Sequence, residues 1–138
     1  MIQGNLKEII KALNKAKTKQ TVLGSTIENN RKILEHKNTG ELILNHKKGK
    51  LMLYQQDSGL NHILCKIAKQ SGITITIDLR DIQGDKKEKA VILARIIQNI
   101  KLIKKFKNKL KIIGMNKHEA QAFLLTLGLP TDMIKKAL

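Results

Sequence analysis

Two spacings of apolar residues alternate along this chain, and together they predict alternating helices and strands. From Leu6 to about Lys17, apolar residues recur three and four positions apart, which is the spacing of one helix face. Asn5 and Glu8 form a capping box at the start of this helix. From Ile73 to Leu79, by contrast, apolar and polar residues alternate strictly, which is the pattern of a β-strand.

The remaining elements follow the same two patterns. Strands are expected at residues 21–23, 41–44 and 111–113, with a small one at 51–54 inside a loop or hairpin at 45–56. Helices are expected at residues 25–36, 58–71, 85–108, 116–127 and 131–138. This alternation predicts an α/β fold with a mostly parallel sheet and right-handed crossovers. The length of 138 residues fits a single domain, 1–138.

Two of these helices have well-defined apolar faces. Ser58 is the expected N-cap of the helix at 58–71, and Gly72 its C-terminal stop. The buried face of that helix is expected to hold Leu60, Ile63, Leu64 and Ile67. The apolar stripe expected in the helix at 85–108 consists of Ala90, Leu93, Ala94, Ile96, Ile97, Ile100 and Ile103.

The strand at 73–79 has one polar side, formed by Thr74, Thr76 and Asp78. Strands of a parallel sheet that is covered on both faces are usually apolar throughout. The polar side therefore either lines the interior of a barrel or forms an exposed sheet face.

The chain carries a large excess of positive charge. Lys and Arg total 27 against 11 Asp and Glu, for a formal net charge of +16. Such an excess indicates a polyanionic partner, most simply a nucleic acid, although a lysine-rich surface solvated by water is the alternative. Since only three of the 27 are Arg and only three residues are aromatic, contacts with phosphate are favoured over base readout or stacking.

Little in the sequence indicates catalysis by the chain itself. The four histidines are scattered and form no H-x-H pair, and no G-x-x-x-x-G-K-[ST] phosphate loop is present. Asp78, Arg80 and Asp81 end a strand, where an ion pair is the simplest interpretation. Cys65 is expected to be a buried thiol in an amphipathic helix. No signal peptide or membrane-spanning run is evident, so we expect a cytoplasmic protein.

The most distinctive stretch is 57–70, DSGLNHILCKIAKQ. It is accompanied, in chain order, by Asn30-Arg31, Leu42-Ile43-Leu44, the strand Ile75 to Arg80, the helix end Lys101 to Phe106, and Glu119 to Leu124. This ordered set resembles ribonuclease P protein component 3, the thirty-kilodalton subunit family of archaea and eukaryotes. The resemblance covers about Thr21 to Leu138.

The resemblance implies a fold. Members of the family form a seven-stranded TIM-like α/β barrel similar to that of PHP metal-dependent phosphoesterases, whereas this chain lacks the first two strand units. We therefore expect a reduced or open TIM-like (PHP-like) α/β barrel. The missing strands would leave sheet edges that a helix or a partner must cover.

The resemblance also implies a function. The chain would be an accessory protein subunit of ribonuclease P, not catalytic alone, that binds the catalytic RNA and protein component 2. It would support RNA-catalysed removal of the 5′ leader from precursor tRNA, which it would contact only indirectly. No cofactor is expected on the protein, Mg²⁺ is expected on the RNA, and no membrane partner is expected. The alternatives are a general basic RNA-binding module or, less favoured, a small metal-dependent phosphoesterase.

Candidate contact residues follow from charge and position. Those expected to bind RNA are Lys47, Lys48, Lys50, Arg80, Lys86, Lys87, Lys101 and Lys105. Those expected to bind a partner are Asp57, Asn61 and His62. Lys86 and Lys87 are strong candidates because the helix dipole disfavours cations at a helix start, whereas Lys101 and Lys105 also suit the dipole near a helix end.

Overall fold

The computed structural model describes residues 1–47 and 58–138. The small strand expected at 51–54, together with Lys48, Lys50 and Asp57, lies outside the described residues. The helices are α1 (Leu6–Lys15), α2 (Ile27–Glu35), α3 (His62–Ser71), α4 (Lys86–Phe106), α5 (Lys117–Thr126), α6 (Thr131–Ala137) and the short 3₁₀ turn η1 (Leu79–Asp81). The strands are β1 (Gln20–Leu23), β2 (Thr39–Leu44), β3 (Thr74–Asp78) and β4 (Leu110–Ile113).

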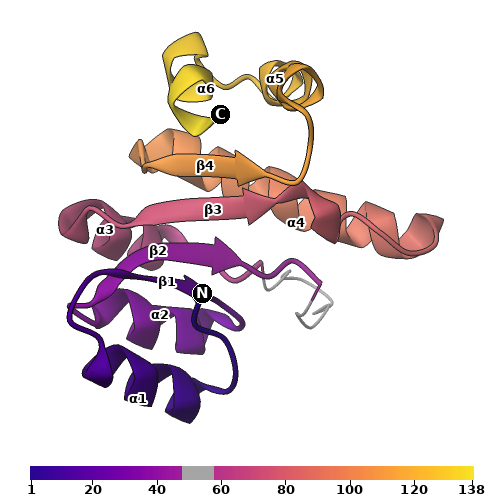
Figure 1. The fold of residues 1–138 in the computed structure, drawn as a ribbon. Helices are drawn as coiled ribbons and strands as arrows, with labels where there is room; N and C mark the ends of the chain where they lie inside the picture. The colour runs from indigo at the N-terminus through magenta and orange to yellow at the C-terminus, as the bar shows by residue number, and fades with distance from the viewer. Residues whose placement is uncertain (48–57) are drawn as a thin grey trace.

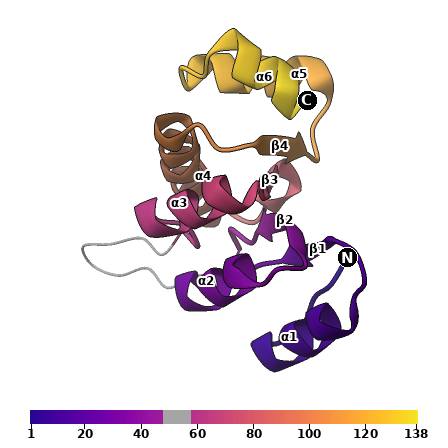
Figure 2. The same cartoon turned by 90° about the vertical axis from the view of Figure 1, so that its left-hand side faces the viewer.

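The four strands form one parallel sheet in the order β1-β2-β3-β4. Because every crossover joins neighbouring strands in the same direction, right-handed connections place α2, α3 and α4 on one face, as Figure 2 shows. The sheet is open and does not close on itself in the described part of the chain. The predicted α/β class and parallel sheet are thus confirmed, the sheet is open, and its relation to a TIM-like barrel stays a prediction.

The core lies between the sheet and these three helices. The strand side chains that fill it alternate with residues on the open face, as a β-strand requires. They are Val22, Leu42, Leu44, Ile75, Ile77, Leu110 and Ile112, all buried. Burial of each such side chain contributes about 1.5–3 kcal/mol, so aliphatic residues alone supply a substantial core.

The other face of the sheet carries a polar network. Glu41 of β2 accepts hydrogen bonds from Thr21 of β1, at 3.0 Å, and from Thr76 of β3. Lys111 of β4 places its Nζ 3.8 Å from Glu41 Oε1. The predicted polar side of β3 is therefore correct, but Thr76 is fully buried because the Glu41 side chain pairs with it.

Both edges of the sheet are partly covered by this chain. Ile2 makes a parallel bridge to Val22, with its N–H donating to Thr21 O at 2.8 Å and its carbonyl accepting from Leu23 N at 2.9 Å. At the opposite edge α6 packs against β4, above it in Figure 1. Ile2 therefore occupies the position that a preceding parallel strand would take.

Helix α3 starts later than the sequence indicates. The expected N-cap Ser58 is wrong: Asn61 caps the helix, its Oδ1 accepting from Leu64 N at 2.9 Å. Gly59 takes a φ of 81°, which turns the chain so that Leu60 is buried ahead of the helix rather than within it. The buried face consequently shifts to Leu64, Cys65 and Ala68, and Ile63 is 40% exposed. Gly72 ends the helix in the left-handed conformation, as predicted.

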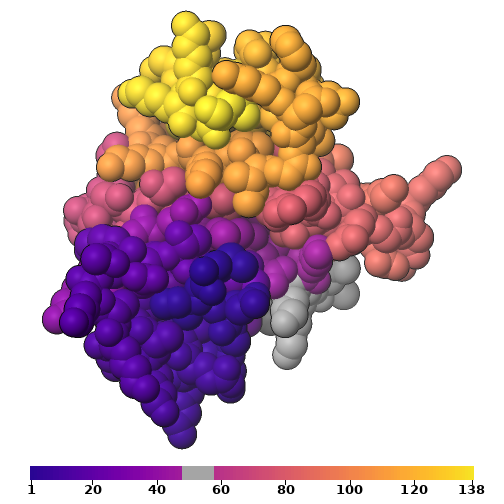
Figure 3. Space-filling view, in the orientation of Figure 1, coloured from indigo at the N-terminus to yellow at the C-terminus, as the bar shows by residue number. Residues whose placement is uncertain are grey.

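Helix α4 also differs from its expected apolar stripe. Its buried residues are Ile92, Arg95, Ile96, Asn99, Ile100 and Ile103. Ala90 is exposed because the first turns of α4 extend beyond the sheet, and they protrude from the body of the molecule in Figure 3. Two polar residues therefore lie inside the buried stripe of this helix.

Candidate nucleic-acid interface

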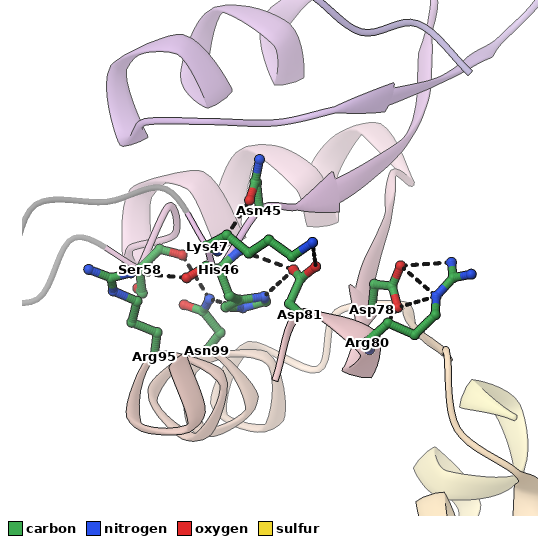
Figure 4. Close-up of polar contacts among 9 residues, drawn as sticks. All are labelled: Asn45, His46, Lys47, Ser58, Asp78, Arg80, Asp81, Arg95 and Asn99. Carbon is green, nitrogen blue, oxygen red and sulfur yellow. Dashed lines mark hydrogen bonds and ion pairs between the residues drawn. The ribbon is translucent and has the colours of Figure 1, made fainter. Parts of the chain in front are cut away.

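The carboxyl-terminal edge of the sheet gathers most of the buried polar contacts, and we call it the carboxyl edge. It comprises the residues that follow β2 and β3, the chain from Ser58 to Leu60, and the facing side of α4 (Figure 4). Ligand sites of parallel α/β folds generally form at this edge, because loops there are free to vary while the strands hold them.

His46 lies at the centre of this edge and is fully buried. Its Nε2 is 2.9 Å from Asn99 Nδ2, and its carbonyl accepts from Arg95 Nη1 at 2.9 Å. Its Nδ1 faces Asp81 Oδ2 at 3.6 Å. Because the Asn99 amide nitrogen is a donor, this contact assigns the acceptor role to Nε2, which is the tautomer with its proton on Nδ1.

The chain that follows the undescribed segment is held from two helices. Asn99 of α4 donates to Ser58 O at 2.8 Å, and Asn30 of α2 donates to Gly59 O at 2.7 Å. Asn30 Oδ1 also accepts from Ser25 N at 2.8 Å. A Cβ on Gly59 would lie 3.1 Å from Asn30 Nδ2, so glycine permits this close approach. The carboxyl edge therefore anchors the chain on both sides of residues 48–57.

Asp78 and Arg80 form a second feature of this edge. Arg80 donates from Nη2 to Asp78 Oδ2 at 2.8 Å and from Nε to Oδ1 at 3.0 Å, the ion pair predicted for this strand end. The side-chain hydrogen bond from Arg80 lowers the pKa of the Asp78 carboxyl, against the opposing effect of its partial burial. The Arg80 side chain is 70% exposed, so its outer face is open to a ligand.

Three of the predicted RNA-binding lysines lie at this edge. Lys47 follows β2, and its Nζ is 3.9 Å from Asp81 Oδ1. Lys86 and Lys87 are exposed in the first turn of α4, which starts on the side to which the strands point in Figure 1. Asp85 caps that turn through a 2.8 Å bond from Glu88 N. Lys47 thus lies beside the network around His46, through Asp81, whereas Lys86 and Lys87 lie on the first turn of α4.

Lys101 and Lys105 lie elsewhere. Both are exposed on α4, and at 1.5 Å per residue Lys101 is about 20 Å along the helix from Lys87. Lys105 places its Nζ 5.7 Å from the Phe106 ring centroid, a cation–π contact. The predicted RNA-binding residues therefore divide between the carboxyl edge and the far end of α4.

The predicted partner-binding residues have separate roles. Asn61 is half-buried and its side chain is engaged in capping α3. His62, the first residue of α3, is exposed. Contact of Asn61 and His62 with a partner stays a prediction, and Asp57 lies outside the described residues.

The described residues also bear on the metal, thiol and membrane features expected from the sequence. Within 1–47 and 58–138, no group of three or more His, Cys, Asp or Glu is placed to hold a metal ion. Cys65 is fully buried as expected, and burial raises its pKa to about 12. None of the described helices has the length and apolarity needed to cross a membrane.

Sequence reasoning missed the buried polar network of this edge. Arg95 and Asn99 fall at i and i+4 within the spacing of Ile92, Ile96 and Ile100. A charged residue and an amide inside an apolar periodicity indicate a buried network, because such groups are buried only when paired. That signal was present, but the partners, His46 and Ser58, were identifiable only from the fold.

Fold and surface together define a basic α/β protein with an open parallel sheet. No protein-family model matches the chain, and no curated protein sequence does. Its structure is similar to that of a chain in the cryo-EM structure of archaeal ribonuclease P with mature tRNA, with a TM-score of 0.71 and 25% sequence identity. The match covers 98% of this chain and 61% of that chain, so this chain spans less than two thirds of its neighbour's length.

Proposed function

We propose that this chain is a protein subunit of ribonuclease P, a shortened relative of component 3. In this role it binds the catalytic RNA and protein component 2, and it supports removal of the 5′ leader from precursor tRNA by that RNA. The observation that carries the proposal is the structural likeness, over 98% of this chain, to a chain from an archaeal ribonuclease P. The sequence resemblance, centred on residues 57–70, supports the same complex.

The charge and the layout of the chain support this role. A net charge of +16 suits a subunit bound to a large RNA, whose phosphates it partly neutralises. The open sheet is compatible with a reduced TIM-like barrel, with Ile2 beside β1 standing where a further strand would lie. The Mg²⁺ that this chemistry requires belongs to the RNA in this proposal, and the protein contributes positioning and charge.

Reconstitution tests the proposal directly. Cleavage of precursor tRNA is measured with the cognate ribonuclease P RNA at limiting Mg²⁺, with protein component 2, and with or without this chain. We expect cleavage to increase when the chain is added, and the chain to co-elute with component 2. No gain in cleavage and no complex with either RNA or component 2 at low ionic strength would refute the proposal.

A general basic RNA-binding module is the second candidate, favoured by the spread of exposed lysines over both ends of α4. It predicts equal affinity for ribonuclease P RNA and for an unrelated structured RNA of the same length. At least tenfold preference for the ribonuclease P RNA in direct competition, with a matching gain in cleavage, would exclude it.

A further inference from the structure

A second basic surface lies at the opposite, amino-terminal edge of the sheet. A groove of about 1060 Å³ runs between α6, the starts of β3 and β4, and the end of α4. Six lysines line it: Lys69, Lys104, Lys107, Lys109, Lys111 and Lys136. We call this the lysine groove. None of the six was among the residues expected to bind RNA.

The lysine groove carries more positive than negative charge. Asp132 is the one acidic side chain among its lining residues. Lys69 donates to Lys107 O at 2.7 Å, and Lys111 pairs with Glu41 at 3.8 Å, so these two are engaged by the protein. The ion pairs of the described chain include none of the other four, Lys104, Lys107, Lys109 and Lys136.

The turn after α4 holds two of these lysines in place. Lys107 ends the helix in the left-handed conformation, with a φ of 54°, and its N–H bonds back to the helix. Asn108, 4% exposed, donates from its side chain to Cys65 O at 2.9 Å. Because Asn108 is fastened to α3, Lys107 and Lys109 on either side of it are displayed from a fixed backbone. The negative, carboxyl-terminal end of the α4 dipole stabilises nearby cations, but it does not explain why four lysines line one groove.

We propose that the lysine groove binds the phosphate backbone of an RNA strand. The lining residues include neither an arginine nor an aromatic side chain, so they offer point-charge contacts to phosphate and no stacking surface for bases or nucleotides. A groove with cations on several sides suits a continuous strand of phosphates better than a single small anion. This inference rests on the proposed function and adds to it a second RNA contact.

The lysine groove and the carboxyl edge, where Lys47, Lys86 and Lys87 are expected to bind RNA, lie at opposite ends of the strands. β3 has five residues, which at about 3.3 Å each separates the lysine groove from the carboxyl edge by roughly 16 Å. One RNA helix or two neighbouring strands can bridge that distance. The RNA is therefore expected to contact both edges at once.

Neutralisation of the groove tests the proposal. Lys104, Lys107, Lys109 and Lys136 are changed together to Gln, and Lys7, Lys11, Lys15 and Lys32 are changed together to Gln as a control of equal charge. All eight are exposed, so both variants should fold. Affinity for ribonuclease P RNA, and for a length-matched structured RNA, is measured from 50 to 300 mM salt.

We expect the groove variant to bind RNA about tenfold more weakly or worse, with a salt slope reduced by about three to four, while the control changes little. Equal losses in the two variants would overturn the groove proposal, because only net charge would then matter. A second outcome would also overturn the groove proposal. If inorganic phosphate saturates the groove at sub-millimolar concentration and the groove variant keeps its affinity for RNA, the groove is a site for a small anion.

Lysine methylation on the wild-type protein gives a readout independent of any substitution. Bound RNA should protect the four groove lysines from reductive methylation and leave Lys7, Lys11, Lys15 and Lys32 reactive. Protection without a gain in tRNA cleavage would support the groove and count against the ribonuclease P role. Cleavage that requires the chain, with all groove lysines reactive, would support that role and reject the groove.

Discussion

The side-chain nitrogen of Asn99 lies 2.9 Å from Nε2 of His46, and both side chains are completely buried. The same nitrogen donates to Ser58 O at 2.8 Å. One amide of α4 thus joins the chain after β2 to the chain before α3. The segments before and after residues 48–57 are therefore both hydrogen-bonded to α4.

Replacement of Asn99 with Ala should destabilise the protein. The change leaves the Ser58 carbonyl and the His46 ring without their donor in a buried site, and each such loss costs about 1–3 kcal/mol. We expect the free energy of unfolding to fall by about 2 kcal/mol or more, measured from urea unfolding. Gln98→Ala, at the exposed neighbouring position, should change it by less than about 0.5 kcal/mol. Equal unfolding midpoints for the two variants would show that the Asn99 contacts contribute nothing.

The ion pair of Asp78 with Arg80 should make stability depend on pH. The pKa of Asp78 is lowered in the folded protein, chiefly by the hydrogen bond from Arg80, so the charged carboxylate favours folding. This contribution is present above the ordinary Asp pKa of about 3.9 and is lost as pH falls through the lowered value. Carbon-detected NMR titration should show the pKa of Asp78 rising toward its ordinary value in Arg80→Gln.

An exposed ion pair supplies the control for that titration. Arg31 pairs with Glu35 at 2.9 Å on α2, away from Asp78. Arg31→Gln should leave the Asp78 titration unchanged. An Asp78 pKa that does not move in Arg80→Gln would mean that another group lowers it.

Cys65 should react only when the protein unfolds. Burial raises its pKa from the ordinary 9.0 to about 12, so the folded protein holds almost no thiolate at pH 8. Since the raised value favours the neutral thiol, its contribution to stability is complete below pH 9 and is lost as pH rises toward 12. We expect the rate of reaction with a disulfide reagent to rise with urea in step with unfolding. Rapid modification in the absence of urea would contradict this burial.

The cations of the carboxyl edge should determine much of the affinity for RNA. Lys47, Lys86 and Lys87 of this edge are changed to Glu together with Lys48 and Lys50, which lie outside the described residues; the change removes the phosphate contacts expected of these lysines and adds repulsion. We expect weaker binding of ribonuclease P RNA and a shallower dependence of log K on log salt. Fluorescence anisotropy across a salt series measures both.

A matched variant separates position from charge in that experiment. Lys7, Lys11, Lys15, Lys17 and Lys32 lie exposed on or beside α1 and α2, and changing them to Glu alters the net charge equally. We expect a smaller loss of affinity from this set. Unchanged affinity and salt slope in the carboxyl-edge variant would reject the assignment of Lys47, Lys86 and Lys87 to RNA binding.

Local features of the chain were well predicted from its sequence. The cap by Asn5, the stop at Gly72, and the buried apolar face of β3 with Ile75 and Ile77 all appear in the structure. Each depends on residues within about four positions of one another, so the printed order of side chains is enough to specify it. The misplaced start of α3 shows the limit, because there the buried turn at Gly59, held by Asn30 from another helix, decided where the helix begins.

The placement of the charged and polar groups needed the tertiary structure. His46 and Asn99 are 53 residues apart, Thr76 becomes buried through Glu41 of a neighbouring strand, and Lys69 meets the end of α4. Such pairs depend on the order of the strands and on the face of the sheet that the helices cover. A short window of sequence does not specify either property. Composition determined that the chain is a strongly basic protein with an aliphatic core. The tertiary structure decided that six of its lysines line one groove at the amino-terminal edge of the sheet, because parallel crossovers bring the ends of helices and the starts of strands to the same side.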